Sequence, residues 1–305
     1  MSSPIPAPFS RAKAIAVLLS IACAFAANHV GAKLAFENGA GMLLPIVLRS
    51  GVAMTALIAI VIIQRRSFIL PRKTAPWQLV MGLLITVQSL FLYSAISRVP
   101  VALALLMSNV FPILLALLTW VLGGPRPTAR AATIMGIILF GLMFVLNVPN
   151  LLFTNDPIDG EWLAGICFAL GAACTFACSL WITEHKLGQL PGPVRSVYTI
   201  GTVFVCIVIA GLLDAMPGGM ALPNAAQGWL ALVTLCALYT VAFATLFMCA
   251  PRLDMSRNAP AMNVEPVASL IFGWIILGQM LGAIQLVGGA IVLSGIVLLA
   301  YSRNR

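Results

Sequence analysis

The chain has 305 residues, of which 61% are apolar types and 8% are charged, and its mean hydropathy is +1.07. Soluble domains carry about 25% charged residues, so this composition excludes a cytosolic enzyme, a secreted disulfide scaffold and a disordered chain. The net charge of +9 comes from basic residues that stand singly or in pairs between apolar runs. A nucleic-acid binding surface needs clustered lysine and arginine, so this scattered arrangement predicts no nucleic-acid partner.

Ten apolar runs follow one another along the chain, each close to the 20 or so residues that a helix needs to cross a bilayer. We predict spans at 14–36, 41–63, 77–97, 100–122, 130–148, 162–183, 195–214, 228–250, 258–279 and 282–301. The runs are continuously apolar rather than alternating, which favours helices over a β-barrel. The sequence thus predicts an all-α membrane protein with ten transmembrane helices.

The basic residues predict the orientation of these spans. Of the 17 lysines and arginines, all but Lys33, Arg49 and Arg98 lie in links on the same side as the N-terminus. Cytoplasmic links carry the excess of lysine and arginine in membrane proteins. Both termini are therefore expected in the cytoplasm.

The two halves of the sequence resemble each other after a shift of 154 residues. Asn-Val-Phe-Pro at 109–112 aligns with Asn-Val-Glu-Pro at 263–266, and Arg98 and Trp120 align with Arg252 and Trp274. Spans 1–5 form one repeat within residues 1–150, and spans 6–10 form the second within residues 151–305. Because each repeat has an odd number of spans, the second crosses the membrane upside down. Such 5+5 inverted repeats are typical of alternating-access transporters, whose binding site lies near the midplane between the halves.

Several motifs make a family resemblance specific. They are Asn28-His-Val-Gly-Ala-Lys33-Leu, Leu48-Arg49, Leu92-Tyr-Ser-Ala-Ile-Ser-Arg98 with Pro112 beyond it, then Pro266, Leu277-Gly-Gln-Met280 and Gly288-Gly289. In order and spacing, over nearly the whole chain, they resemble the EamA-type branch of the drug/metabolite transporter superfamily. The resemblance implies a carrier of small organic metabolites, such as amino acids, in the inner membrane of a cell.

The chain departs from that family at two positions. Where the family usually has Gly-Glu-Arg at the end of spans 4 and 9, this sequence reads Gly124-Pro125-Arg126 and Gly278-Gln279-Met280. A role given to those glutamates elsewhere is therefore not carried over. Family members transport different metabolites on one fold, so the resemblance does not name the substrate.

Glu265 is the first candidate for chemistry, because ionisable groups inside a membrane are costly and usually functional. Pro266 follows it, and Pro112 occupies the equivalent place in span 4. Proline removes a helical donor, so we expect two kinks with free carbonyls beside Asn109 and Asn263. In one interpretation Glu265 is the titrating group of a substrate or proton site. In the other it is a buried structural partner of Arg49 or Lys33.

Other polar residues in the spans complete the predicted site. His29 and Lys33 lie one helical turn apart and share a face, although Lys33 can equally extend to the lipid headgroups. Arg49 is expected to be a structural charge that pairs with a carboxylate or with carbonyl oxygens. The predicted substrate-binding residues are His29, Gln88, Asn109, Tyr239, Asn263 and Glu265; the structural charges are Lys33 and Arg49; the kinks are Pro112 and Pro266.

The sequence therefore predicts a secondary transporter that moves a small organic metabolite by alternating access, with proton coupling as one mode and exchange as the other. The direction of transport, export, is implied by the family resemblance only. No His-Glu-x-x-His, P-loop or aspartate-rich pair is present, so enzymatic chemistry is not expected. The expected partners are a small-molecule substrate, the lipid bilayer and protons, with no metal and no cofactor. The alternative is a non-transporting membrane component that acts with a partner protein.

Overall fold

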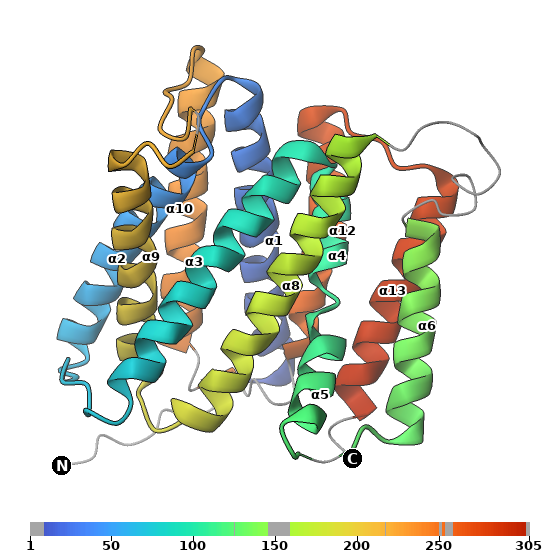
Figure 1. Ribbon diagram of the computed structural model, residues 1–305, viewed down its shortest axis with the longest axis horizontal. Coiled ribbons are helices and arrows are strands. Elements are labelled where there is room, and N and C mark those ends of the chain that lie inside the picture. Colours follow the sequence, from blue (N-terminus) through green and yellow to red (C-terminus); the bar gives the residue numbers. More distant parts are fainter. Residues whose placement is uncertain are drawn as a thin grey trace.

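The structure is a computed structural model that describes residues 9–124, 126–145, 159–216, 218–249, 252–253 and 259–302. These residues form a bundle of helices without a strand (Figure 1). The first half contains α1 (Arg11–Glu37), α2 (Leu43–Ile63), α3 (Ala75–Arg98), α4 (Val101–Ser108), α5 (Phe111–Val121) and α6 (Ala129–Val145). The second half contains α8 (Gly160–Lys186), α9 (Gly192–Leu212), α10 (Ala226–Cys249), the 3₁₀ helix η2 (Ala259–Val264), α12 (Glu265–Leu277) and α13 (Ala283–Ser302).

Seven helical segments in the described residues are long and apolar enough to cross a membrane. They are α1, α2, α3, Val101–Val121, α8, α9 and Ala226–Leu246, and three shorter apolar helices are Ala132–Val145, Glu265–Leu277 and Ala283–Leu298. The chain is therefore a multi-pass helical membrane protein. The count of ten crossings remains a prediction. The ends of the predicted spans at 146–148, 250 and 258 lie outside the described residues.

Kinks were expected at Pro112 and Pro266, and in the structure spans 4 and 9 are each divided into two helical segments at these prolines. In the first repeat, α4 ends at Ser108 and α5 begins at Phe111, with Pro112 in its first turn. In the second, η2 ends at Val264 and α12 begins at Glu265, with Pro266 in its first turn. Proline cannot donate to the preceding turn but fits the first turn of a helix, so each proline starts a new segment.

The two repeats are interlocked rather than side by side. Helix α3 packs on α8, and the equivalent helix of the second repeat, α10, packs on α1. In the same way α1 packs on α12, and α8 packs on α4 and α5. The second helices, α2 and α9, pair with each other, and so do the last helices, α6 and α13. Figure 1 shows α1 and α8 running in opposite directions through the bundle. The helices therefore follow the inverted symmetry expected from the sequence.

The shift of 154 residues does not hold for the first two helices of each repeat. Helix α8 begins 149 residues after α1 (160 against 11), and α9 begins 149 residues after α2 (192 against 43). The shift of 154 holds for α5 and α12 (111 and 265) and for α6 and α13 (129 and 283). The extra residues of the second repeat fall after its second helix, where a loop accepts an insertion at little cost.

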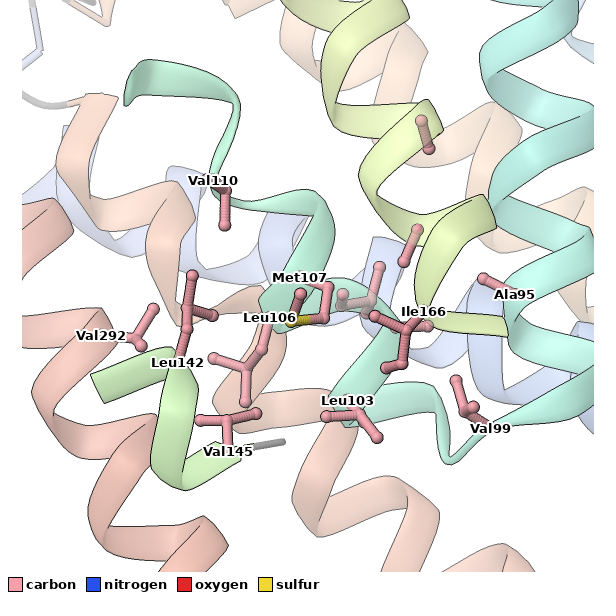
Figure 2. Close-up of a cluster of buried hydrophobic side chains, with 14 of the residues drawn as sticks. Ala95, Val99, Leu103, Leu106, Met107, Val110, Leu142, Val145, Ile166 and Val292 are labelled. Atoms are coloured by element: carbon pink, nitrogen blue, oxygen red, sulfur yellow. The ribbon is translucent and has the colours of Figure 1, made fainter. Parts of the chain in front are cut away.

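The largest buried apolar cluster surrounds the short helix α4 (Figure 2). Leu103, Leu106 and Met107 are at most 4% exposed and lie between α8 and the pair formed by α6 and α13. Close helix contact continues at Gly288 on α13, where an added Cβ would lie 2.6 Å from the Val145 nitrogen. Small residues of this kind let membrane helices approach closely.

Candidate substrate-binding site

A buried arginine lies at the centre of the bundle. Arg49 in α2 is 5% exposed. Its Nη1 donates to Asn28 Oδ1 in α1 at 3.5 Å, and its Nη2 donates to Ser89 Oγ in α3 at 3.2 Å. Asn28 is held in turn, because its Nδ2 donates to the Leu235 carbonyl of α10 at 2.9 Å. Three helices of the first repeat and one of the second thus fix the position of the guanidinium.

Two tyrosine rings contact the same guanidinium. The Arg49 Cζ lies 4.5 Å from the ring centroid of Tyr93 in α3 and 4.6 Å from that of Tyr239 in α10. Contacts below about 6 Å are attractive, and more so when the cation is away from water. Phe25 and Phe243 support the Tyr239 ring at centroid distances of 6.0 and 4.6 Å. The arginine is therefore enclosed by aromatic groups from both repeats.

His29 and Glu265 form the second charged element. The His29 Nε2 lies 3.4 Å from Glu265 Oε1, with side chains 9% and 20% exposed. Glu265 is the first residue of α12, a position set by Pro266. The His29 ring lies 6.2 Å from the ring of Tyr93, which also contacts Arg49. Tyr93 thus connects the His29–Glu265 pair with the arginine.

The structure gives Glu265 a partner other than the expected Arg49 or Lys33. Glu265 contacts His29 rather than Arg49 or Lys33, and Lys33 Nζ donates to the Ser97 carbonyl at 2.9 Å. Among the described residues, the oxygens that accept from Arg49 are the neutral ones of Asn28 and Ser89. The expected pairing of Arg49 with a carboxylate is therefore not seen, because α12 presents its one carboxylate to α1 and not to α2.

The remaining predicted residues are spread more widely. Tyr239 belongs to the cluster, whereas Gln88 is half-buried on α3 and takes part in none of the cluster's contacts described above. The Asn109 Nδ2 donates to Leu105 O of its own helix at 2.8 Å, so this side chain closes the end of α4. The backbone of Asn263 lies in η2, and its side chain is outside the described part of the chain.

Three buried polar atoms in this region have no hydrogen-bond partner in the described structure. They are His29 Nδ1, the Tyr93 hydroxyl oxygen and Thr240 Oγ1. Tyr93 is fully buried, and Thr240 follows Tyr239 in α10. Buried polar groups are nearly always bonded, so orphan groups around a buried arginine point to a ligand or to water.

Sequence reasoning did not select Asn28 or Tyr93 as site residues. One signal was present, because Ser89 and Tyr93 are four residues apart and share a helix face with each other. A buried arginine in a neighbouring span favours such a face, which offers both a hydroxyl and an aromatic ring.

Two arginines that align in the repeats make contacts at opposite ends of the bundle. Arg98, at the end of α3, pairs with Glu161 at the start of α8 (Nε to Oε2, 2.9 Å) and lies over the Phe168 ring at 5.1 Å. Arg252, beyond α10, lies over the Phe9 ring at 4.1 Å, and the Phe9 nitrogen donates to its carbonyl at 2.9 Å. Each arginine thus joins the third helix of one repeat to the first helix of the other.

The helices and the buried cluster define a membrane protein of the transporter type, built from two inverted repeats around a central polar site. The profile of the EamA-like transporter family matches residues 12–147 and 163–301, and the chain belongs to this family.

Comparison with solved structures agrees on the fold. One solved structure, titled only "Crystal structure of protein", matches with a TM-score of 0.61 at 18% identity, covering 97% of this chain and 100% of its own. At that identity the likeness concerns the fold alone. No curated protein sequence matches the chain.

Proposed function

We propose that the chain is a secondary transporter that moves a small organic metabolite, an amino acid or a similar compound, across the inner membrane by alternating access. The observation that carries the proposal is the central cluster, in which α1, α2 and α3 of one repeat meet α10 and α12 of the other. A site between inverted repeats becomes accessible from either side when the repeats rock against each other.

The contacts at the two ends of the bundle support this mechanism. Arg98 with Glu161 closes one end, and Arg252 with Phe9 closes the other. In alternating access one end opens while the other stays closed, so the two contacts would break in turn. The Arg98–Glu161 pair has side chains that are 28% and 72% exposed. Such a surface ion pair is worth only about 0–1 kcal/mol, which is weak enough to break during a transport cycle.

The His29–Glu265 pair is the proposed proton site. A carboxylate and an imidazole in contact can take up or release one proton between them, and both side chains are largely buried. The pair joins α1 of the first repeat to α12 of the second, so a change in its charge acts directly on the interface that moves. Export driven by the proton gradient is the direction we propose, with substrate exchange as the competing mode.

Transport can be tested with the purified full chain in proteoliposomes. The vesicles are loaded with a defined pool of amino acids, monocarboxylates, amines and nucleosides, and released compounds are measured by mass spectrometry with and without a pH gradient. Release of a subset above that from protein-free vesicles is expected. If no compound leaves and the protein instead co-purifies with a membrane partner, the alternative of a non-transporting component is favoured.

A further inference from the structure

The central arginine has no acidic partner among its contacts in the described structure. Arg49 is 5% exposed, and its contacts in the described structure are the neutral groups of Asn28, Ser89, Tyr93 and Tyr239. A guanidinium stays charged in any protein environment. A buried charge without a counter-charge is unfavourable by several kcal/mol, so a structural arginine normally has an acidic partner.

The described carboxylate in this part of the bundle is already in contact with another group. Glu265 Oε1 lies 3.4 Å from His29 Nε2 and is attached to α12, whereas the guanidinium contacts come from α1, α2, α3 and α10. Glu265 therefore contacts His29, and Arg49 has no anion in direct contact among the described residues.

Arg49 also has hydrogen-bonding capacity left. A guanidinium carries five N–H donors, and the bonds to Asn28 and Ser89 use two of them. The tyrosine rings add attraction without offering an acceptor oxygen at the guanidinium. The fully buried Tyr93 hydroxyl, on the ring that touches Arg49, is a further polar group with no partner in the described structure.

Comparison of the repeats shows that the fold does not require the charge of Glu265. Phe111 begins α5 where Glu265 begins α12, within the aligned Asn-Val-x-Pro motifs. The break before Pro112 forms with an uncharged residue at this place, so the carboxylate of Glu265 serves something that is not shared by both halves.

We propose that Arg49 binds the carboxylate of the transported compound, so that the substrate is an organic acid or an amino acid with a free carboxylate. This inference rests on the proposed transport function and names the substrate class of the same site. A guanidinium fork matches a carboxylate with two parallel hydrogen bonds. A single carboxylate also balances a single cation, whereas a doubly charged phosphate beside Glu265 would leave excess negative charge.

The geometry assigns a second contact to Tyr93. Its hydroxyl donates to the same carboxylate, which satisfies the orphan group only when substrate is bound. Removing this hydroxyl leaves the ring, and therefore the cation–π contact to Arg49, in place. Tyr93→Phe thus tests ligand binding without removing the arginine's surroundings.

The experiment uses matched pairs of a carboxylate and its carboxamide: the common L-amino acids, lactate and benzoate, each against its own amide, with inorganic phosphate as a separate arm. Binding to the purified full chain is measured as thermal stabilisation in detergent. Release is measured in proteoliposomes. We expect at least one carboxylate to bind about tenfold to a hundredfold more tightly than its amide, as for a lost charge-assisted hydrogen bond.

The variants are Arg49→Gln, Arg49→Lys and Tyr93→Phe, with Arg195→Lys as the matched control. Arg195 is another half-buried arginine, and its Nη1 donates to the Leu187 carbonyl at 3.5 Å, away from the cluster. Arg49→Gln should abolish the carboxylate preference and Arg49→Lys should weaken it. Tyr93→Phe should lower carboxylate affinity severalfold, and the control should behave as the parent. If Arg49→Gln does not fold, Arg49→Lys and Tyr93→Phe still test whether this site binds the carboxylate.

The outcomes separate this inference from the proposed function. Release of amines, amides or nucleosides without preference for carboxylates keeps the transporter and overturns the carboxylate site. Stabilisation by a carboxylate that depends on Arg49, without release, keeps the site and contradicts transport. Stabilisation by inorganic phosphate but by no carboxylate, or by none of the compounds, overturns the inference.

Discussion

His29 and Glu265 lie 236 positions apart in the sequence (265 minus 29), yet their Nε2 and Oε1 atoms are 3.4 Å from each other across the interface of the two repeats. The contact joins the first helix of one repeat to the broken helix of the other. A change in the protonation of this pair therefore acts at the surface along which the repeats would move.

Glu265→Gln tests the role of this pair in proton coupling. The amide keeps the shape and can still hydrogen-bond to a neutral His29, so the amount of folded protein should stay the same. The response of net flux to a pH gradient should be lost, because the amide does not titrate, while exchange of substrate should continue. Gradient-driven flux at the parental level would remove Glu265 from the coupling mechanism.

Glu37→Gln is the matched control for that change. Glu37 is the last residue of α1 and is exposed, so the same substitution there lies outside both the central cluster and the Arg98–Glu161 contact. Loss of the pH response in both variants would show that removing any acidic side chain abolishes proton coupling, and that the effect is not specific to the central pair.

Pro112→Ala and Pro266→Ala are expected to reduce transport more than folding. Each change restores a backbone donor and favours one continuous helix through the break. We expect normal membrane levels and about tenfold slower flux, equivalent to ~1.4 kcal/mol on the transport barrier. Flux is measured in proteoliposomes with matched amounts of protein. Parental flux in both variants would show that the helix breaks contribute to packing and not to transport.

Arg98 and Glu161 should separate during each transport cycle. In a double variant, Arg98→Cys with Glu161→Cys, a reducible bifunctional thiol reagent should cross-link α3 to α8 and stop flux, and a reducing agent should restore it. The single variants under the same reagent control for the seven native cysteines, which are all free. Undiminished flux with complete cross-linking would contradict opening at this end.

Gly288→Ala should destabilise the pair of last helices. The new Cβ would lie 2.6 Å from the Val145 nitrogen and 2.7 Å from the Gly141 carbonyl, both backbone atoms that cannot turn away. A loss of about 1–3 kcal/mol is expected, as for other overpacked sites. Gly136→Ala on α6 is the control, because nothing lies within 4 Å of its added Cβ. Thermal unfolding in detergent measures both, and equal stability would contradict this packing.

The expected topology places both termini in the cytoplasm. A reporter that is active only in the cytoplasm should work when fused after Arg305 and in the links near Arg72 and Arg195. One that is active only outside should work near Asp156. An external signal at the C-terminus would require an odd number of crossings and would contradict the ten-span arrangement.

Much of this architecture could be predicted from the sequence alone. Continuous apolar runs indicate helices because lipid offers no partner to an unbonded backbone group. The Asn-Val-x-Pro pairs reveal the repeat and the positions of Pro112 and Pro266. The two prolines also predicted the kinks in spans 4 and 9, because proline lacks the backbone donor that a continuous helix needs.

Only the tertiary structure decided which polar groups meet. Helices apolar on every side give no periodic signal of which face turns inward, since lipid and protein interior favour the same residues. The rotation of α2 about its axis determines that Arg49 contacts Tyr93 and Tyr239, and that of α12 determines that Glu265 contacts His29. These rotations are set by close packing between helices far apart in the sequence, which no local pattern encodes.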